Sequence, residues 1–246
     1  MPGSCPTFFG VEALLCRVGV LMEELLEQFK TWAFLRELPE ETQGCHCVRE
    51  EKLENEKYFF FSYCRQDGAR WVKAYYDIAK KSYFMRIGLG LLEFNDISYF
   101  SQSLGEFEAL LRSRLDKTLE EFMTFVPEQA GVAIQEKKLL QWPYAEQLPE
   151  ELSGFKLLLS PKEPVKVING SYLILDYSDL VAQTSLVLYY NIYRDEFFGE
   201  LRVQGLPELV SDFDAKTLTE LEQKLEKRLT SVLETLRQRL EKEQNP

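Results

Sequence analysis

The stretch YFFFSYCRQDGARWVKAYYDIAKKSYFMRI, residues 58–87, recurs as YLILDYSDLVAQTSLVLYYNIYRDEFFGEL, residues 172–201. The two copies are 114 positions apart, and the match continues without a gap from 58–122 to 172–236. It contains 15 identities in 65 aligned positions, where ordinary residue usage would give roughly four by chance. An internal repeat of this length indicates one structural unit made twice.

Each copy is rich in aromatic and β-branched residues at first and becomes helical later. The pattern predicts four strands in each copy, and short turns between them favour an antiparallel meander. The predicted strands are 45–49, 58–64, 71–78 and 82–89, then 155–160, 172–177, 185–192 and 196–203.

A helix follows each meander, and its start carries the sequence of a capping box. Ser103 with Glu106 marks the first start, and Thr217 with Glu220 marks the second. Matching leucine stripes predict that one face of each helix packs on its sheet. Dimerisation through Leu236 and Leu240 at the end of the second helix stays open as an alternative.

A helix is also predicted before each meander. Apolar residues recur at helical spacing from 22 to 38, where Pro39 ends the pattern. The copy at 136–148 is interrupted by Pro143 and is expected to be shorter. The fold class is therefore α+β, a tandem duplication of a helix, a four-stranded antiparallel meander and a helix, each a two-layer sandwich. The two sheets either join into one continuous sheet around a pseudo-twofold axis, which would protect their edges, or stay separate.

The predicted organisation is an N-terminal extension at 1–21, a first unit at 22–126 and a second unit at 127–246. The apolar stretch 8–22 is interrupted by Glu12 and Arg17, and it is too short to span a bilayer. A natural start at Met22 stays open. No membrane association is expected. Five cysteines, an odd number in a chain of 246 residues, favour reduced thiols and a cytoplasmic protein over a disulfide framework.

The formal net charge of −11 repels phosphate backbones, so no nucleic acid is expected as a partner, and cationic or mixed partners fit better. The helix–meander–helix arrangement is similar to small chaperone-type or adaptor domains and to the duplicated saddle of TATA-binding proteins. The acidic balance argues against the DNA-binding role that the saddle would imply.

No motif predicts a catalytic residue, a cofactor or a metal site. Cys45, His46 and Cys47 are chemically capable, but on a strand the two thiols would lie on one face and His46 on the other. The spacing is also not that of a zinc knuckle. His46 is the only histidine, and no nucleophile motif accompanies it.

The aromatic strands are the best candidate for a contact surface. Strict alternation would place Tyr58 and Phe60 on one face and Phe61 and Tyr63 on the other, so that both faces need a cover. The main interpretation is that these residues pack in the hydrophobic core. The outward-facing members are expected to contact a partner. The candidate partner-contact residues are Tyr58, Phe60, Tyr75, Tyr76, Tyr172, Tyr189 and Tyr190.

These observations favour a non-enzymatic protein-interaction module whose partner is another protein. It would be chaperone-like, an adaptor, or an inhibitor or immunity-type binder. The alternative is a small-molecule binder or an enzyme that uses the cleft between the two repeats. Whether the chain is a monomer or a homodimer stays undecided.

Overall fold

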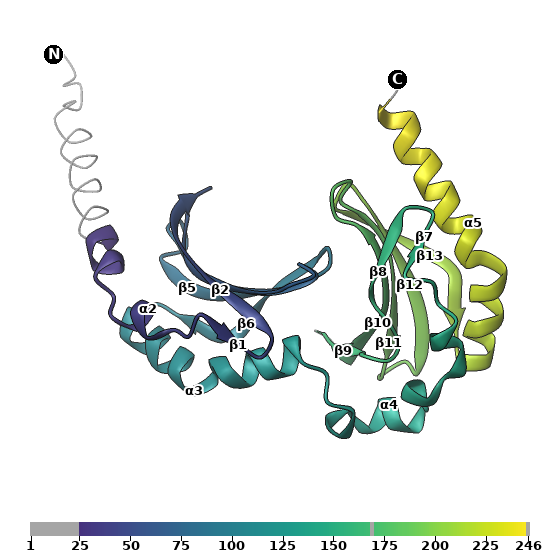
Figure 1. Cartoon of the computed structure of the whole chain (residues 1–246), viewed down its shortest axis with the longest axis horizontal. Helices are drawn as coiled ribbons and strands as arrows, with labels where there is room; N and C mark the ends of the chain where they lie inside the picture. Colours follow the sequence, from purple (N-terminus) through teal and green to yellow (C-terminus); the bar gives the residue numbers. More distant parts are fainter. Residues whose placement is uncertain (1–24, 168–169, 245–246) are drawn as a thin grey trace, which may run out of the picture.

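The computed structural model describes residues 25–167 and 170–244. It is an α+β structure with two antiparallel sheets, and a long helix follows each sheet. Figure 1 shows α3 (Leu104–Met123) beneath the first sheet and α5 (Leu218–Gln244) along the outer side of the second. The extension at 1–21 and the start at Met22 lie outside the described residues.

The first sheet has six strands in the order in which they occur along the chain. They are β1 (Glu41–Thr42), β2 (Cys45–Glu54), β3 (Lys57–Arg65), β4 (Arg70–Asp77), β5 (Ser82–Leu89) and β6 (Leu92–Ser101). The second sheet has seven strands, ordered β13-β12-β11-β10-β8-β7, with β9 paired to β10. They are β7 (Glu151–Leu152), β8 (Phe155–Leu159), β9 (Val165–Lys166), β10 (Ser171–Asp179), β11 (Thr184–Asn191), β12 (Glu196–Val203) and β13 (Leu206–Ala215).

The four predicted strands of each copy are present, but the predicted strand number was too low. The meander continues into a further strand, β6 in the first unit and β13 in the second. Their sequences alternate weakly because each is an edge strand that carries polar residues such as Glu93 and Asn95. Periodicity is a weak signal where neither face is fully buried.

The two sheets are separate, so the alternative of one continuous sheet was wrong. The edges are protected locally. The pairing of β6 with β5 is irregular between Tyr83 and Met85, and that of β13 with β12 is irregular at the equivalent positions, Phe197 and Gly199. Irregular pairing of this kind discourages the addition of another strand.

The helical segments before the sheets are shorter than predicted. Residues 25–30 are helical, and a break at 31–33 precedes α2 (Phe34–Glu37). Trp32 and Phe34 are both buried, and positions two apart lie on opposite sides of a continuous helix, so the break lets both enter the core. The second copy consists of α4 (Val132–Glu136) and three single turns, η1 (Pro127–Gln129), η2 (Leu139–Gln141) and η3 (Pro143–Glu146).

A β-bulge decides which aromatic side chains face the helices. In β3, Phe60 is an extra residue between the pairs Phe59–Tyr75 and Phe61–Ala74. The residue after it therefore stays on the same face instead of switching. The second copy has an irregularity 114 positions later, in the pairing of β10 with β11.

The bulge brings Tyr58, Phe60, Phe61 and Tyr63 into the core cluster below the first sheet. The predicted division of these rings between two faces was therefore wrong after Phe60. Strict alternation fails wherever one strand carries an unpaired residue.

The same two kinds of side-chain hydrogen bond stabilise each copy internally, at equivalent positions. The Trp32 indole donates to Glu108 at 2.6 Å, and the Trp142 indole donates to Glu222 at 2.7 Å. A tyrosine hydroxyl in each copy donates to a proline carbonyl, at 2.9 Å from Tyr63 to Pro39 and at 2.7 Å from Tyr177 to Pro149. Side chains outside the 65 aligned positions are thus part of the repeated unit.

The hydroxyl caps of both long helices are confirmed. Ser103 Oγ accepts the Glu106 amide at 3.4 Å, and Thr217 Oγ1 accepts the Glu220 amide at 3.1 Å. The returning glutamate bonds differ from a simple capping box. Glu220 accepts the amide of Lys216 at 3.0 Å, and Glu106 accepts the hydroxyl of Ser101 at 3.0 Å.

The leucine stripe of α5 packs on its own sheet. Leu236 and Leu240 are buried with the rest of the stripe in the core of the second unit. They are therefore not exposed for the dimerisation that the heptad-like spacing left open. Among the described residues, no helix combines the length and apolar character needed to cross a bilayer.

Candidate functional site

The units meet where the β5–β6 hairpin of the first touches the helix-free face of the second sheet. Leu89, at the hairpin tip, is buried. Gly90 packs directly against the Asp176 carboxylate of β10. The carbonyl of Leu91 accepts a hydrogen bond from Arg202 on β12 at 3.2 Å. The β5–β6 hairpin thus contacts the second sheet both by close packing and by a hydrogen bond.

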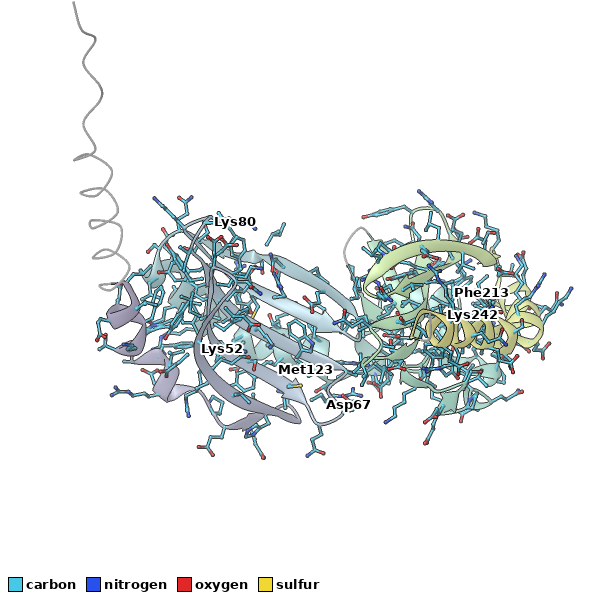
Figure 2. The ribbon with its side chains drawn as sticks, turned by 90° about the horizontal axis from the view of Figure 1, so that it is seen from above. Lys52, Asp67, Lys80, Met123, Phe213 and Lys242 are labelled. Carbon is cyan, nitrogen blue, oxygen red and sulfur yellow. The ribbon has the colours of Figure 1, made fainter. Side chains whose placement is uncertain are left out.

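An ion pair joins the units beside this hairpin. Arg70 on β4 is 2% exposed, and its guanidinium donates to Glu163 of the second unit at 2.9 Å. Arg65 lies 3.6 Å from the same carboxylate. Figure 2 shows Asp67, which accepts from Arg65, on the side of the first unit that faces the second.

A groove of about 740 Å³ lies next to the junction. We call it the inter-unit groove. Its wall comes from β6, and its floor comes from the helix-free face of β11, β12 and β13. The lining residues used below are Glu93, Phe94, Tyr189, Arg194, Glu196, Phe198, Glu200, Arg202, Leu209 and Asp214.

The floor is aromatic. The rings of Tyr189 and Phe198 stack with centroids 5.0 Å apart and an interplanar angle of 18°. They are neighbours because their residues pair across β11 and β12. Burial raises the pKa of Tyr189 above its usual value, with a further contribution from the charge of Glu200. The Tyr189 hydroxyl therefore stays neutral and adds no charge to the floor.

Charged side chains surround this floor, four carboxylates against two guanidinium groups. Glu200 pairs with Arg202 at 2.8 Å. Glu196 lies 2.9 Å from Lys216 and 3.3 Å from Arg194. Hydrogen bonds from Lys216 and then Arg194 hold the pKa of Glu196 below its usual value. By formal charge, the lining of the groove is thus net acidic, with Lys216 beside it.

A second cavity of about 620 Å³ lies between β6, the end of α3 and β9. Phe94 and Val167 line both cavities. Tyr172 lines only the second, where its hydroxyl packs against Gly131. The edge of β6 therefore has an open space on each side.

The helix-free face of the first sheet carries a row of aromatic rings with centroids 5.4–5.6 Å apart. The row consists of Phe59, Tyr75, Phe84 and Phe100. Cationic side chains lie over it, including Lys73 above Phe59 at 5.9 Å and Arg86 above Tyr75 at 5.1 Å. Long basic side chains shield such rings with their apolar stems. The basic side chains above it account for the burial of Tyr75.

All seven predicted contact residues are buried, and six of them, all except Tyr75, belong to the two hydrophobic core clusters. Tyr58, Phe60, Tyr76 and Tyr190 are 0–8% exposed and face the helices. Of the helix-free-face pair, Tyr75 and Tyr189, only Tyr189 lines the inter-unit groove. A partner contact for these residues stays a prediction, and in this structure it would have to involve Tyr189 or the second cavity beside Tyr172.

Several groove residues were not among the predicted ones. Phe198, Glu196 and Glu200 lie on one strand, and Phe94 lies on the strand that was missed. The alignment of the copies already paired Phe198 with Phe84. A comparison of the charges around that pair would have singled out the glutamates.

The thiols and the histidine of β2 lie as predicted. Cys45 and Cys47 are buried, and His46 is exposed. Burial raises the pKa of both thiols. Across residues 25–167 and 170–244, no group of three or more His, Cys, Asp or Glu side chains is arranged to hold a metal ion.

No protein-family model matches this chain, and comparisons with curated proteins and with solved structures return no significant match.

Proposed function

We propose that the protein is a non-enzymatic interaction module that holds a segment of a partner protein in the inter-unit groove. The observation that carries this proposal is the composite origin of the groove. Its aromatic floor belongs to the second unit, and its wall belongs to β6 of the first. Neither unit forms this site without the hairpin contact.

The groove combines the surfaces that protein partners use. Leu209 is 87% exposed at its edge, and the half-buried ring of Phe198 lies next to it, backed by the buried ring of Tyr189. Apolar and aromatic centres with a charged rim are typical of protein-binding sites. The lowered pKa of Glu196 suits a permanent docking charge better than a general base, which works best with a pKa near the operating pH.

The same proposal places the chain in the cytoplasm. Cys45, Cys47 and Cys64 are free thiols, and such thiols persist in a reducing compartment.

Photo-crosslinking in the native cell tests the proposal. A photo-reactive amino acid at Leu209 should give one dominant adduct with another protein. The same residue at Val132, which is 68% exposed but outside the groove, should not give that adduct.

The repeat offers a matched pair of variants for the same experiment. Phe198→Ala should abolish the Leu209 adduct, whereas Phe84→Ala, the equivalent change outside the groove, should leave it intact. Equal adducts from Leu209 and Val132, or an adduct that survives Phe198→Ala, would contradict the proposal.

The size of the groove favours one alternative, a small-molecule ligand. A volume of about 740 Å³ lies within the range of about 300–1,000 Å³ that is usual for small-molecule pockets. Native mass spectrometry of the purified chain distinguishes a small-molecule ligand from a protein segment as the occupant of the groove. A retained compound that Phe198→Ala loses and Phe84→Ala keeps would favour this alternative.

A further inference from the structure

The two copies keep the aromatic pair but differ in the charges around it. Tyr75 and Phe84 of the first unit stack at 5.4 Å, as Tyr189 and Phe198 do in the second. Three positions around the second pair are acidic where the first copy is neutral or basic. The substitutions between copies are Ser82 to Glu196, Arg86 to Glu200 and Phe100 to Asp214.

All three acidic residues line the inter-unit groove. These three substitutions thus lie in the copy whose helix-free face is walled by the other unit. A fourth carboxylate, Glu93, comes from that wall, and its side chain is 49% exposed. The acidic character is therefore a property of the groove and not of the repeated fold.

Basic side chains in and beside the groove pair with some of these carboxylates: Glu196 lies 2.9 Å from Lys216, and Glu93 lies 3.4 Å from Arg86. The Arg202 guanidinium donates hydrogen bonds to Glu200 and to the Leu91 carbonyl. It therefore stabilises the contact between the two units. Arg194 lies at 3.3 Å from Glu196 and is largely exposed. Glu93 and Asp214 remain exposed on the two sides of the aromatic floor.

We infer that the occupant of the groove is an extended protein segment in which large apolar residues alternate with lysine or arginine. The inference rests on the proposed function and names its partner by chemistry. In an extended chain, successive side chains point to opposite sides. Apolar side chains can therefore meet the Tyr189–Phe198 floor while the cations meet the carboxylates at the rim. A cation near these rings also gains from cation–π attraction.

Defined peptides test this chemistry with the full chain. Three fluorescent 12-residue peptides share Leu and Phe at alternate positions and carry Lys, Ser or Glu at the others. Fluorescence anisotropy should show that the Lys peptide binds at least about tenfold more tightly than the Ser peptide. The Glu peptide should be weakest, and added salt should reduce the difference.

Charge reversal assigns the effect to the groove. Glu196→Lys should weaken the Lys peptide about tenfold. Glu54→Lys changes the net charge equally at an acid on the first sheet, outside the groove, and should change binding less than about twofold. Circular dichroism of both variants verifies that they are folded.

Equal binding of the three peptides, or equal effects of Glu196→Lys and Glu54→Lys, would overturn the inference. Failure of the proposed function is distinguishable. If the Leu209 adduct forms but its cross-linked segment is not basic, the function stands and the partner chemistry is wrong. If neither the Leu209 adduct nor peptide binding is found, the proposed function and the inferred partner chemistry are both wrong.

Discussion

The carboxylate of Asp176 lies directly against the backbone of Gly90, and this contact joins the two units. A Cβ atom on residue 90 would overlap with Asp176 Oδ2. Gly90 also has a φ of 59°, in the left-handed region that glycine adopts readily. The position therefore requires glycine for two separate reasons.

We predict that Gly90→Ala lowers the free energy of unfolding by about 3 kcal/mol, of which about 1 kcal/mol comes from the left-handed backbone and the rest from the overlap. Gly68→Ala is the matched control because Gly68 has a φ of 71° with nothing within 4 Å of the added Cβ. It should lose only about 1 kcal/mol. Urea unfolding of both variants measures the difference. Equal losses of unfolding free energy would show that the Asp176 side chain moves aside at no energetic cost.

Asp176 also predicts a pH dependence of stability. Burial raises its pKa to about 7, and neither the Ser178 hydroxyl nor the charge of Arg202 offsets this. An aspartate in an unfolded chain has a pKa of about 3.9. The folded chain therefore holds the proton more tightly, and its stability falls as the pH rises from about 4 to about 7.

Between pH 5 and pH 8 this group should cost about 3 kcal/mol of unfolding free energy in the wild type. Asp176→Asn should lose that part of the pH dependence in urea unfolding experiments. Asp179→Asn is the control. Burial favours a raised pKa there too, but the Ala182 amide and Arg237 outweigh it and lower the pKa, so this variant should keep the fall between pH 5 and pH 8. A wild-type profile in Asp176→Asn would refute the assignment.

The indole–carboxylate bonds predict unequal losses in the two copies. Glu108 has a second partner, Arg112 at 2.8 Å, whereas among the described residues the indole of Trp142 is the one hydrogen-bond donor to the Glu222 side chain. Trp142→Phe should therefore cost about 2 kcal/mol and Trp32→Phe about 1 kcal/mol.

Thermal or urea unfolding gives both values. A double-mutant cycle of Trp142→Phe with Glu222→Ala, which removes the acceptor, checks that the loss belongs to the bond and not to the packing of the smaller ring. Additive effects in the cycle would rule out the bond as the cause.

Much of the fold could be predicted from residue patterns. Tyr58 and Tyr172, the hydroxyl caps at Ser103 and Thr217 and the leucine stripes all act within one unit, through periodicity or short-range hydrogen bonds. The bulge at Phe60 could not be read in this way, because an aromatic residue fits either face of a strand until its pairing partner is known. The edge strands β6 and β13 were missed because they are only partly buried.

The candidate site could be predicted only in part. Tyr189 was among the expected contact residues and lines the groove, although it is as buried as Tyr58 and Tyr190, which face the helices. What separates them is which face a helix covers and which face the other unit walls. Glu93 and Glu200 are more than 100 positions apart in the chain, and only the docking of the β5–β6 hairpin brings them to one groove.

The repeated sequence was sufficient to establish the unit, its antiparallel meander and the buried face of its long helix, because these depend on spacing that is present in each copy. The relation between the units depended on the tertiary structure. It rests on contacts such as Gly90 with Asp176 and Arg70 with Glu163, which have no counterpart in periodicity. The groove exists because two similar units meet through different surfaces, and identical patterns cannot encode that difference.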